Sequence, residues 1–401
     1  MNIDLLKSLI QVNDKKILLI ILDGVGGIPD QSNMTELEKA NKKNMDELAK
    51  KNDLGYMVPV DIGITPGSGP GHLAVFGYEP TEYPIGRGIL EALGLDIKID
   101  DETVTARCNF ATIDSEGKIV DRRAGRISSE DNVRLVKLLN ESFKDYKKYN
   151  VEFYSGKEHR FVLIIRGIKN DAFVNDTDPQ VVNEKPLEAK PLKGDSAECA
   201  EIINEIFEKS LKVLKDEKKA NCILFRGISK MPSIEPFKDR YGLKAACIAT
   251  YPMYKGLASL VKMDILKTGE SLEDQVRTLK ENYNGYDFFF FHVKKTDSYG
   301  EDGNFENKVR VIEEFDKILP EILSLGFEVV AITADHSTPS VMKAHSYHYV
   351  PLLFINSYAR PVDVKGFSER ECLKGSIGKI YSKELITLML AASSKLKKFG
   401  A

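Results

Sequence analysis

Three apolar, strand-like runs of this sequence end in side chains that can bind a divalent metal. The runs cover residues 17–22, 288–293 and 327–333. The side chains that follow them are Asp23, Asp297, Glu301, Asp335, His336 and, nine residues after His336, His345. Carboxylates and imidazoles at the carboxyl ends of several strands of one sheet are how an open α/β fold builds a metal site. Each residue alone has a plainer interpretation, such as a turn cap or a solvated acidic segment, but three separate strand ends of this kind favour a metal site.

A segment rich in glycine and proline, Ile64-Thr-Pro-Gly-Ser-Gly-Pro-Gly-His-Leu73, frames Ser68. These residues predict a tight turn, with a helix beginning near His72. A serine in such a turn presents its hydroxyl in the open, close to backbone N–H groups that favour a phosphate. An ordinary loop is the alternative, but beside metal ligands a serine activated as an alkoxide is the better interpretation.

Basic side chains gather in one middle part of the chain. They are Arg107, Arg122, Arg123, Arg126, His159 and Arg160. An arginine presents a planar fork that binds phosphate or carboxylate through two hydrogen bonds. A basic surface loop or a nucleic-acid patch is the alternative. No aromatic residue interrupts the 121–126 cluster and the whole chain has a formal charge of −3, so we expect a small, multiply anionic substrate and no nucleic acid.

The composition is that of an ordinary globular protein, with 401 residues of which 42% are hydrophobic and 29% charged. No apolar run reaches the ~20 residues that span a bilayer, and the N-terminus lacks the basic and apolar pattern of a secretion signal. The five cysteines are scattered and form no CxxC pair, so we interpret them as buried, reduced thiols. We therefore expect a cytoplasmic protein without a membrane partner. Length alone suggests two to three domains.

Strand-like runs alternate with long amphipathic stretches, which predicts an α/β fold with a mainly parallel sheet covered by helices on both faces. Strands are expected at 16–22, 104–113, 151–155, 160–166, 221–226, 244–249, 286–293, 327–333 and 350–355. Helices are expected at 34–52, 88–94, 129–142, 195–215, 253–263, 271–284, 304–325 and 382–396. Pro320 is expected to kink or end the helix that contains it.

One segment departs from this alternation. Two closely spaced strands, 151–155 and 160–166, predict a hairpin within a small α+β module. Metal-ligand candidates lie on both sides of the module in the chain. We therefore predict a discontinuous catalytic domain, 1–103 with 186–401, and an inserted substrate-binding cap over 104–185.

Several motifs together resemble those of the archaeal-type, cofactor-independent (2,3-bisphosphoglycerate-independent) phosphoglycerate mutases of the alkaline phosphatase superfamily. They are Ile21-Leu-Asp-Gly-Val25, Thr65-Pro-Gly-Ser-Gly-Pro-Gly-His-Leu73, Gly86-Arg-Gly88, Glu91-Ala-Leu-Gly94, Asp121-Arg-Arg-Ala-Gly-Arg126, His292-Val-Lys-Lys-Thr-Asp297 and Ala334-Asp-His-Ser-Thr-Pro339. The resemblance runs in order across nearly the whole chain. It implies an alkaline-phosphatase-like metal domain with a smaller inserted domain, and the interconversion of 3-phosphoglycerate and 2-phosphoglycerate through a phosphoserine enzyme.

The resemblance also implies roles for individual residues. Ser68 would be the nucleophile, and one metal would be held by Asp23, Ser68, Asp335 and His336. The other metal would be held by Asp297, His345 and Glu301. The family usually has histidine at the position of Glu301, and a carboxylate there favours manganese or magnesium over zinc or cobalt. The substrate would be bound by Arg107, Arg123, Arg126, His159, Arg160 and Lys255.

Two other functions remain open at this stage. The same metal residues would serve a phosphatase, or a phosphotransferase that acts on another small alcohol such as homoserine. A binding protein that has lost catalysis is disfavoured, because Ser68, Asp335 and His336 are all present. If the chain is a mutase, the inserted module is expected to close over the site about hinges near 98–104 and 182–192, which would keep water from the phosphoserine. The sequence specifies no oligomeric state.

Overall fold

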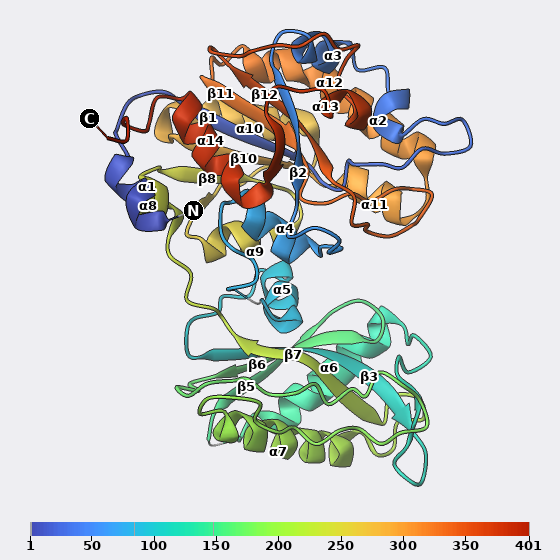
Figure 1. Cartoon of the computed structure of the whole chain (residues 1–401). Coiled ribbons are helices and arrows are strands. Elements are labelled where there is room, and N and C mark those ends of the chain that lie inside the picture. Colours follow the sequence, from blue (N-terminus) through green and yellow to red (C-terminus); the bar gives the residue numbers. More distant parts are fainter. Residues whose placement is uncertain (1, 84, 147, 401) are drawn as a thin grey trace. The chain divides into compact units, whose positions relative to one another are not determined.

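The computed structural model of the chain describes residues 2–83, 85–146 and 148–400 (Figure 1). The chain forms two compact units, each with its own sheet. Unit 1 comprises Met1–Tyr83 and Ile234–Ala401, and unit 2 comprises Pro84–Ser233. Among the described residues, no helix combines the length and the apolar character that a bilayer crossing requires.

Unit 1 is built on an eight-stranded sheet with the order β13-β2-β12-β11-β1-β10-β8-β9. Its strands are β1 (Ile17–Leu22), β2 (Asp53–Val58), β8 (Ala245–Ile248), β9 (Asp264–Ile265), β10 (Phe288–Val293), β11 (Val329–Thr333), β12 (Val350–Asn356) and β13 (Gly378–Tyr381). Only β12 runs against the others, as an antiparallel strand between β11 and β2. The predicted mainly parallel sheet is therefore confirmed.

Helices cover both faces of this sheet, as predicted (Figure 1). The helices of unit 1 are α1 (Ile3–Leu9), α2 (Glu36–Lys39), α3 (Lys43–Ala49), α4 (Ser68–Val75), α8 (Phe237–Tyr241), α9 (Pro252–Leu260), α10 (Leu272–Asn282), α11 (Lys295–Glu301), α12 (Phe305–Leu323), α13 (Glu369–Cys372) and α14 (Leu385–Ala392), with short 3₁₀ turns at Tyr283–Gly285 and Ser382–Glu384. Right-handed crossovers between parallel strands place α2, α3, α10 and α12 on one face and α9, which contacts α4, on the other.

The central strands of unit 1 are buried on both faces. Every residue of β1, β10 and β11 is buried, including the four consecutive phenylalanines Phe288, Phe289, Phe290 and Phe291. A strand between two layers of helices has no solvated side, which is why these runs read as continuously apolar rather than alternating.

Unit 2 has a five-stranded antiparallel sheet in which β3 is central. Its strands are β3 (Thr103–Ile113), β4 (Ile119–Asp121), β5 (Asn150–Ser155), β6 (Arg160–Arg166) and β7 (Cys222–Lys230). Its helices are α5 (Arg87–Gly94), α6 (Ser129–Phe143) and α7 (Ala197–Leu214). The predicted hairpin is β5 with β6, and β3 pairs with β4, β6 and β7. Helices α6 and α7 share an apolar core with the sheet.

Several elements differ from the sequence-based expectation. The helix expected at 34–52 is two short helices, and the strand β2 that follows it was not predicted. Helix α12 contains Pro320 and continues to Leu323. The sequence placed the inserted module at 104–185, whereas unit 2 extends from 84 to 233, because α5, α7 and β7 pack with its sheet. All five cysteines are buried and free, as predicted.

Candidate active site

Strand register brings the metal-ligand candidates of unit 1 to one edge of the sheet. Strand β1 lies between β10 and β11 and is parallel to both. Leu22 pairs with Val293, and Ile21 pairs with Thr333, so the three strands end at nearly the same level. The residues that follow each strand therefore emerge side by side, which is the geometry expected of a site at the carboxyl ends of parallel strands.

A first ligand group consists of Asp23, Asp335 and His336, whose ligand-type atoms lie within 4.8 Å of one another. His336 Nε2 lies 3.1 Å from Asp335 Oδ2 and 3.5 Å from Asp23 Oδ1. All three side chains are fully buried. Two buried carboxylates beside one imidazole form a donor set that a divalent cation can bind.

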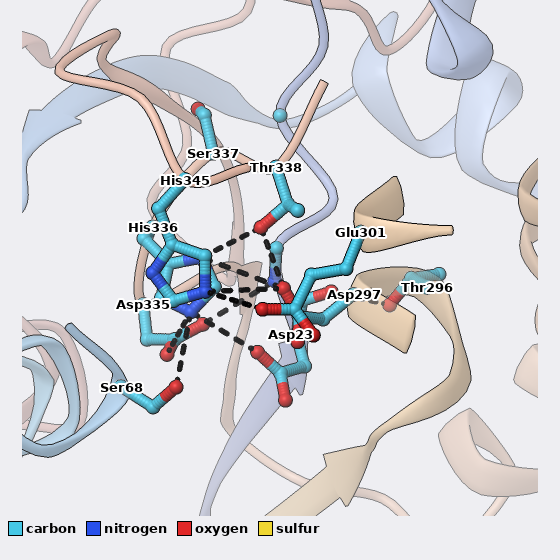
Figure 2. A network of polar contacts seen from close by, with 12 residues as sticks. Asp23, Ser68, Thr296, Asp297, Glu301, Asp335, His336, Ser337, Thr338 and His345 are labelled. Carbon is cyan, nitrogen blue, oxygen red and sulfur yellow. Dashed lines mark hydrogen bonds and ion pairs between the residues drawn. The ribbon is translucent and has the colours of Figure 1, made fainter. Parts of the chain in front are cut away.

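Ser68 stands at the edge of the first ligand group (Figure 2). Its hydroxyl lies 3.4 Å from His336 Nε2, and Ser68 is the first residue of α4. The helix therefore begins at Ser68, whereas the sequence predicted a start near His72. A Cβ on Gly71 would lie 2.6 Å from the carbonyl oxygen of Asp335, so this glycine allows α4 to approach the loop after β11.

A second ligand group consists of Asp297, His336 and His345. The rings of His336 and His345 are stacked with centroids 3.7 Å apart, and His345 Nε2 lies 3.5 Å from Asp297 Oδ1. Glu301 Oε1 lies 3.6 Å from the same His345 nitrogen, although the Glu301 side chain is 55% exposed. Asp297 and Glu301 share one face of α11 because they are four residues apart. Figure 2 shows both carboxylates on the side of His345.

The buried carboxylates of the first ligand group have unmet hydrogen-bonding capacity. Both oxygens of Asp23 and Oδ2 of Asp335 have no hydrogen-bond partner among the described residues. Burial raises the pKa of Asp23, but the nearby Lys294, His292 and His336 outweigh it and hold that pKa well below the usual value. Asp23 is thus an anion in the folded protein, and unsatisfied buried anionic oxygens fit a metal ion.

The sequence did not single out several residues that support the site. They are His72, Tyr254, His292, Lys294 and Thr338. The Lys294 ammonium lies 3.2 Å from Asp23 Oδ2, forms an ion pair with Asp297 and donates to the Tyr254 hydroxyl at 3.0 Å. His72 Nδ1 lies 3.0 Å from Asp335 Oδ2. The signal for Lys294 was its position directly after β10, which matches that of Asp23 after β1.

The predicted basic residues of unit 2 line one cavity of about 280 Å³, which we call the arginine pocket. It is lined by Arg107, Asn109, Arg122, Arg123, Arg126, His159, Arg160 and Arg226. Sequence analysis missed Arg226, which comes from β7, a strand far along the chain from the other basic residues. Lys255, the remaining predicted substrate-binding residue, lies on α9 of unit 1.

Some guanidinium groups of the arginine pocket are anchored and others are free to meet a ligand. Arg122 donates two hydrogen bonds to the buried Asp178, at 2.9 and 2.6 Å. The side chain of Arg226 donates to Gln180 at 3.0 Å. Arg123, Arg126 and Arg160 are exposed. Nε of Arg107 lies 3.4 Å from Glu91 Oε1 and Nε of Arg226 lies 3.5 Å from Asp176 Oδ2, so these two guanidinium groups are paired with carboxylates. The donors left for an anion are those of the three exposed arginines.

The loop that carries Arg123 and Arg126 is held in an unusual backbone conformation. Ala124, Gly125 and Arg126 all have positive φ, at 48°, 62° and 51°. Asp121 stabilises the turn by accepting hydrogen bonds from the backbone N–H groups of Arg123 and Gly125 at 2.8 and 2.7 Å. Non-glycine residues in the left-handed region cost about 1 kcal/mol each and concentrate at functional sites.

Comparisons with known proteins agree on one family. Residues 49–220 match the family model described as 2,3-bisphosphoglycerate-independent phosphoglycerate mutase. A probable 2,3-bisphosphoglycerate-independent phosphoglycerate mutase of Thermosipho melanesiensis is 50% identical over 397 residues, which cover 99% of this chain and 98% of that protein. A protein of the same description from Thermus thermophilus is 51% identical over 400 residues, covering 99% of this chain and 98% of that protein.

Two solved structures share the fold of this chain. The PH0037 protein of Pyrococcus horikoshii aligns with a TM-score of 0.80 at 31% identity, over 97% of this chain and 100% of that one. The cofactor-independent phosphoglycerate mutase of Thermoplasma acidophilum aligns with a TM-score of 0.74 at 29% identity, over 94% of this chain and 100% of that one. With half of its residues shared along its full length with curated relatives, this chain belongs to the family of 2,3-bisphosphoglycerate-independent phosphoglycerate mutases.

Proposed function

We propose that this protein interconverts 3-phosphoglycerate and 2-phosphoglycerate through a phosphoserine at Ser68, with two divalent metal ions and without 2,3-bisphosphoglycerate. The observation that supports this most is the position of the Ser68 hydroxyl, 3.4 Å from His336 Nε2 in a family of mutases. Moving a phosphoryl group between two hydroxyls of one small acid requires an acceptor that holds the group in between. Ser68, at the N-terminus of α4, is that acceptor in our proposal.

The first ligand group would hold one metal through Asp23, Asp335 and His336, with Ser68 as a further ligand. The metals, when bound, lower the pKa of the serine hydroxyl and neutralise charge on the phosphoryl oxygens. Ser68 is the first residue of α4, and the backbone N–H groups at the start of a helix favour a phosphate. Lys294, which contacts Asp23 and Asp297, adds a positive charge at the edge where both groups meet.

The other metal would be held by Asp297 and His345 of the second ligand group together with Glu301, while His336 serves the first metal. Oxygen ligands are hard donors, and this set has two carboxylates and one imidazole. The family usually has two imidazoles and one carboxylate there. By ligand softness the site therefore favours manganese or magnesium over zinc or cobalt.

The arginine pocket would bind the charged ends of the glycerate. Its exposed Arg123, Arg126 and Arg160 can each form charge-assisted, bidentate hydrogen bonds with a carboxylate or a phosphate. In the proposed reaction the glycerate must turn while one end stays bound, and water must be excluded from the phosphoserine. We therefore propose that unit 2 serves as a cap that moves about its two connections to unit 1.

A coupled assay tests this function. Purified, Mn²⁺-loaded protein is given 3-phosphoglycerate, with enolase as the reporter of 2-phosphoglycerate and no 2,3-bisphosphoglycerate. Ser68→Ala should lower the rate by more than about 100-fold, because the phosphoryl acceptor is gone. Ser324→Ala, at the C-terminal end of α12, is the matched control and should behave like the wild type.

Two outcomes of this assay would count against the mutase. Release of inorganic phosphate without 2-phosphoglycerate would indicate a phosphatase, or a phosphotransferase for another alcohol that must then be identified. Mutase activity that survives in Ser68→Ala would show that the phosphoryl group does not pass through Ser68. We expect the protein to act in the cytoplasm on this small acid, in keeping with its five buried, free thiols.

A further inference from the structure

Thr338 is held at every one of its polar groups. Its backbone N–H donates to the carbonyl oxygens of Gly24 and Gly26, both at 3.1 Å, and its carbonyl accepts from Lys308 Nζ at 2.8 Å. Its hydroxyl contacts Asp297 and His336. The residue is fully buried. It therefore lies between the first and the second ligand groups with no freedom to turn away (Figure 2).

The hydroxyl of Thr338 has one proton, and its surroundings determine where that proton points. Oγ1 donates this proton to Asp297 Oδ1 at 2.6 Å. The same oxygen lies 2.9 Å from His336 Nδ1. With its only proton used on Asp297, Thr338 must accept from His336, so Nδ1 of that ring carries the hydrogen.

This hydrogen on Nδ1 leaves Nε2 of His336 with a free lone pair. Nε2 is the nitrogen that lies 3.1 Å from Asp335 Oδ2, 3.5 Å from Asp23 Oδ1 and 3.4 Å from the Ser68 hydroxyl. Only a nitrogen without hydrogen can bind a metal. The bond from Nδ1 to Thr338 thus selects the tautomer and the ring orientation that the first ligand group needs.

The chain makes room for Thr338 at two glycines. A Cβ on Gly24, whose φ is +61°, would lie 2.4 Å from Thr338 Oγ1 and 2.8 Å from Asp297 Oδ1. A Cβ on Gly300 would lie 2.3 Å from the Thr338 carbonyl oxygen. Any side chain at either position would displace the threonine, so the two glycines and Thr338 form one packed arrangement.

A buried ion pair supports this arrangement from behind. Lys308 on α12 is fully buried, lies 3.6 Å from Glu36 Oε1 and also reaches the Gly26 carbonyl at 3.4 Å. Glu36 in turn accepts from the backbone N–H of Ser340 at 2.8 Å. A buried charge that is paired and hydrogen-bonded resists displacement. The loops after β1 and β11 are thereby tied to each other and to α12.

We propose that Thr338 is a positioning residue that links the two ligand groups, by fixing the tautomer of His336 and the orientation of Asp297 through one hydroxyl. This inference rests on the proposed metal site. Removing the hydroxyl therefore weakens metal binding at both groups at once, although Thr338 is not itself a ligand. Partners of this kind typically contribute 10- to 100-fold to metal affinity.

The tautomer can be read directly in metal-free protein. ¹⁵N-histidine-labelled protein at pH 8 gives separate two-bond correlations for each ring nitrogen, and the chain has only six histidines to assign. In the wild type and in Thr338→Ser we expect hydrogen on Nδ1 of His336. In Thr338→Val, which keeps the shape of the side chain but lacks the hydroxyl, we expect a mixture of tautomers. Hydrogen on Nε2 of His336 in the wild type would overturn the proposal, whether or not the valine variant folds.

Metal affinity gives the second readout. Titration calorimetry with MnCl₂ should show about 10- to 100-fold weaker binding at both sites in Thr338→Val, and near-wild-type binding in Thr338→Ser. Thr278→Val is the matched control, since that hydroxyl bonds to Thr268 and Asp274 on and near α10. Wild-type affinity in Thr338→Val, or loss at only one site, would contradict the link. If the wild type itself binds no Mn²⁺, the proposed function fails, and the tautomer experiment still decides the role of Thr338.

Discussion

The two ligand groups and the arginine pocket contrast in how firmly their charged side chains are held. In the first ligand group, Asp23, Asp335 and His336 are fully buried, and other buried residues surround them. In the arginine pocket only Arg122 has a two-bond anchor, while Arg123, Arg126 and Arg160 are exposed. One region is built before its ligand arrives, and the other keeps flexible donors.

This difference follows from what each region has to bind in the proposed reaction. A metal ion demands fixed distances and angles, and a ligand displaced by 1 Å is lost to it. A glycerate that turns between two phosphoryl transfers needs hydrogen-bond donors that can follow it. Long arginine side chains with free ends provide such donors, at the cost of side-chain entropy when they bind.

Removal of metal should have the largest effect, because the ligand groups depend on a cation to balance their carboxylates. We expect treatment with EDTA to reduce mutase activity by more than about 100-fold and added Mn²⁺ to restore it. Chelation should also lower the melting temperature of unit 1, since a bound ligand at 100 times its Kd contributes about 2.7 kcal/mol. Full activity after exhaustive chelation would show that catalysis does not depend on a metal ion at the ligand groups.

Loss of a free arginine should come next. Arg123→Ala or Arg126→Ala removes a charge-assisted contact worth about 1.5–3 kcal/mol, so the KM for phosphoglycerate should rise about 10- to 100-fold. Hydrolysis of p-nitrophenyl phosphate, which lacks a carboxylate, should change much less. Arg134→Ala, on the surface of unit 2 and paired with Glu217, is the matched control. Equal losses on both substrates would show that these arginines do not grip the glycerate.

The third effect concerns the arginine pocket, where His159 should make the free energy of unfolding depend on pH. Burial, aided by Arg160, lowers the pKa of His159 from its usual 6.5 to about 4. Between pH 4 and 6.5 the unfolded chain binds a proton at His159 that the folded chain does not bind. The folded state is therefore at its full stability above pH 6.5 and loses stability as the pH falls toward 4. From pH 7 to pH 5 the free energy of unfolding should fall by about 2 kcal/mol more in the wild type than in His159→Gln. Denaturant unfolding at both pH values measures this, and an equal fall in the two proteins would contradict the prediction.

Glu301 gives the smallest and most specific effect. Glu301→His should leave metal bound and shift the preference from Mn²⁺ toward Zn²⁺ or Co²⁺, because imidazole is a softer donor than carboxylate. Metal content after growth or dialysis in equal amounts of each ion measures the preference. Glu306→His, at the start of α12, controls for an added imidazole nearby. An unchanged preference in Glu301→His would show that Glu301 is not a metal ligand.

Much of unit 1 could be predicted because its signals are local. Strands such as β1 and β10 are almost entirely apolar, and carboxylates lie just beyond their ends, so Asp23 and Asp297 could be proposed as ligands from position alone. Strand β2 was missed because Asp53–Val58 contains an aspartate and a glycine, both disfavoured in strands, and follows closely on a segment with a helical pattern. The antiparallel direction of β12 was not predictable either, since strand direction depends on how the chain returns to the sheet.

The unpredicted parts of the site depend on contacts between distant segments. Arg226 reaches the arginine pocket only because β7 pairs with β3, and nothing near Arg226 in the sequence indicates that pairing. Thr338 was visible as part of a motif, but its role depends on one oxygen placed between Asp297 and His336. The inserted module predicted at 104–185 is narrower than unit 2 for the same reason, because the sequences of α7 and β7 fit an alternating α/β domain equally well.

The order in which strands join the sheet of unit 1 has a consequence for how the protein is made. β1 lies between β10 and β11, and the backbone N–H of Gly24 bonds to Asp335, which is 311 residues later. Unit 2 is continuous in sequence and can fold while the ribosome is still extending the chain. β1 must wait until β10 and β11 have emerged. In the interval its six apolar residues have no partner strand, and they are joined by four successive phenylalanines when β10 appears. Pairings between segments so far apart in the chain form slowly, and until they form the apolar segments are exposed and prone to aggregate. The first ligand group is therefore assembled among the last features of the nascent protein, and a chaperone that shields β1 during synthesis should raise the yield of metal-binding enzyme.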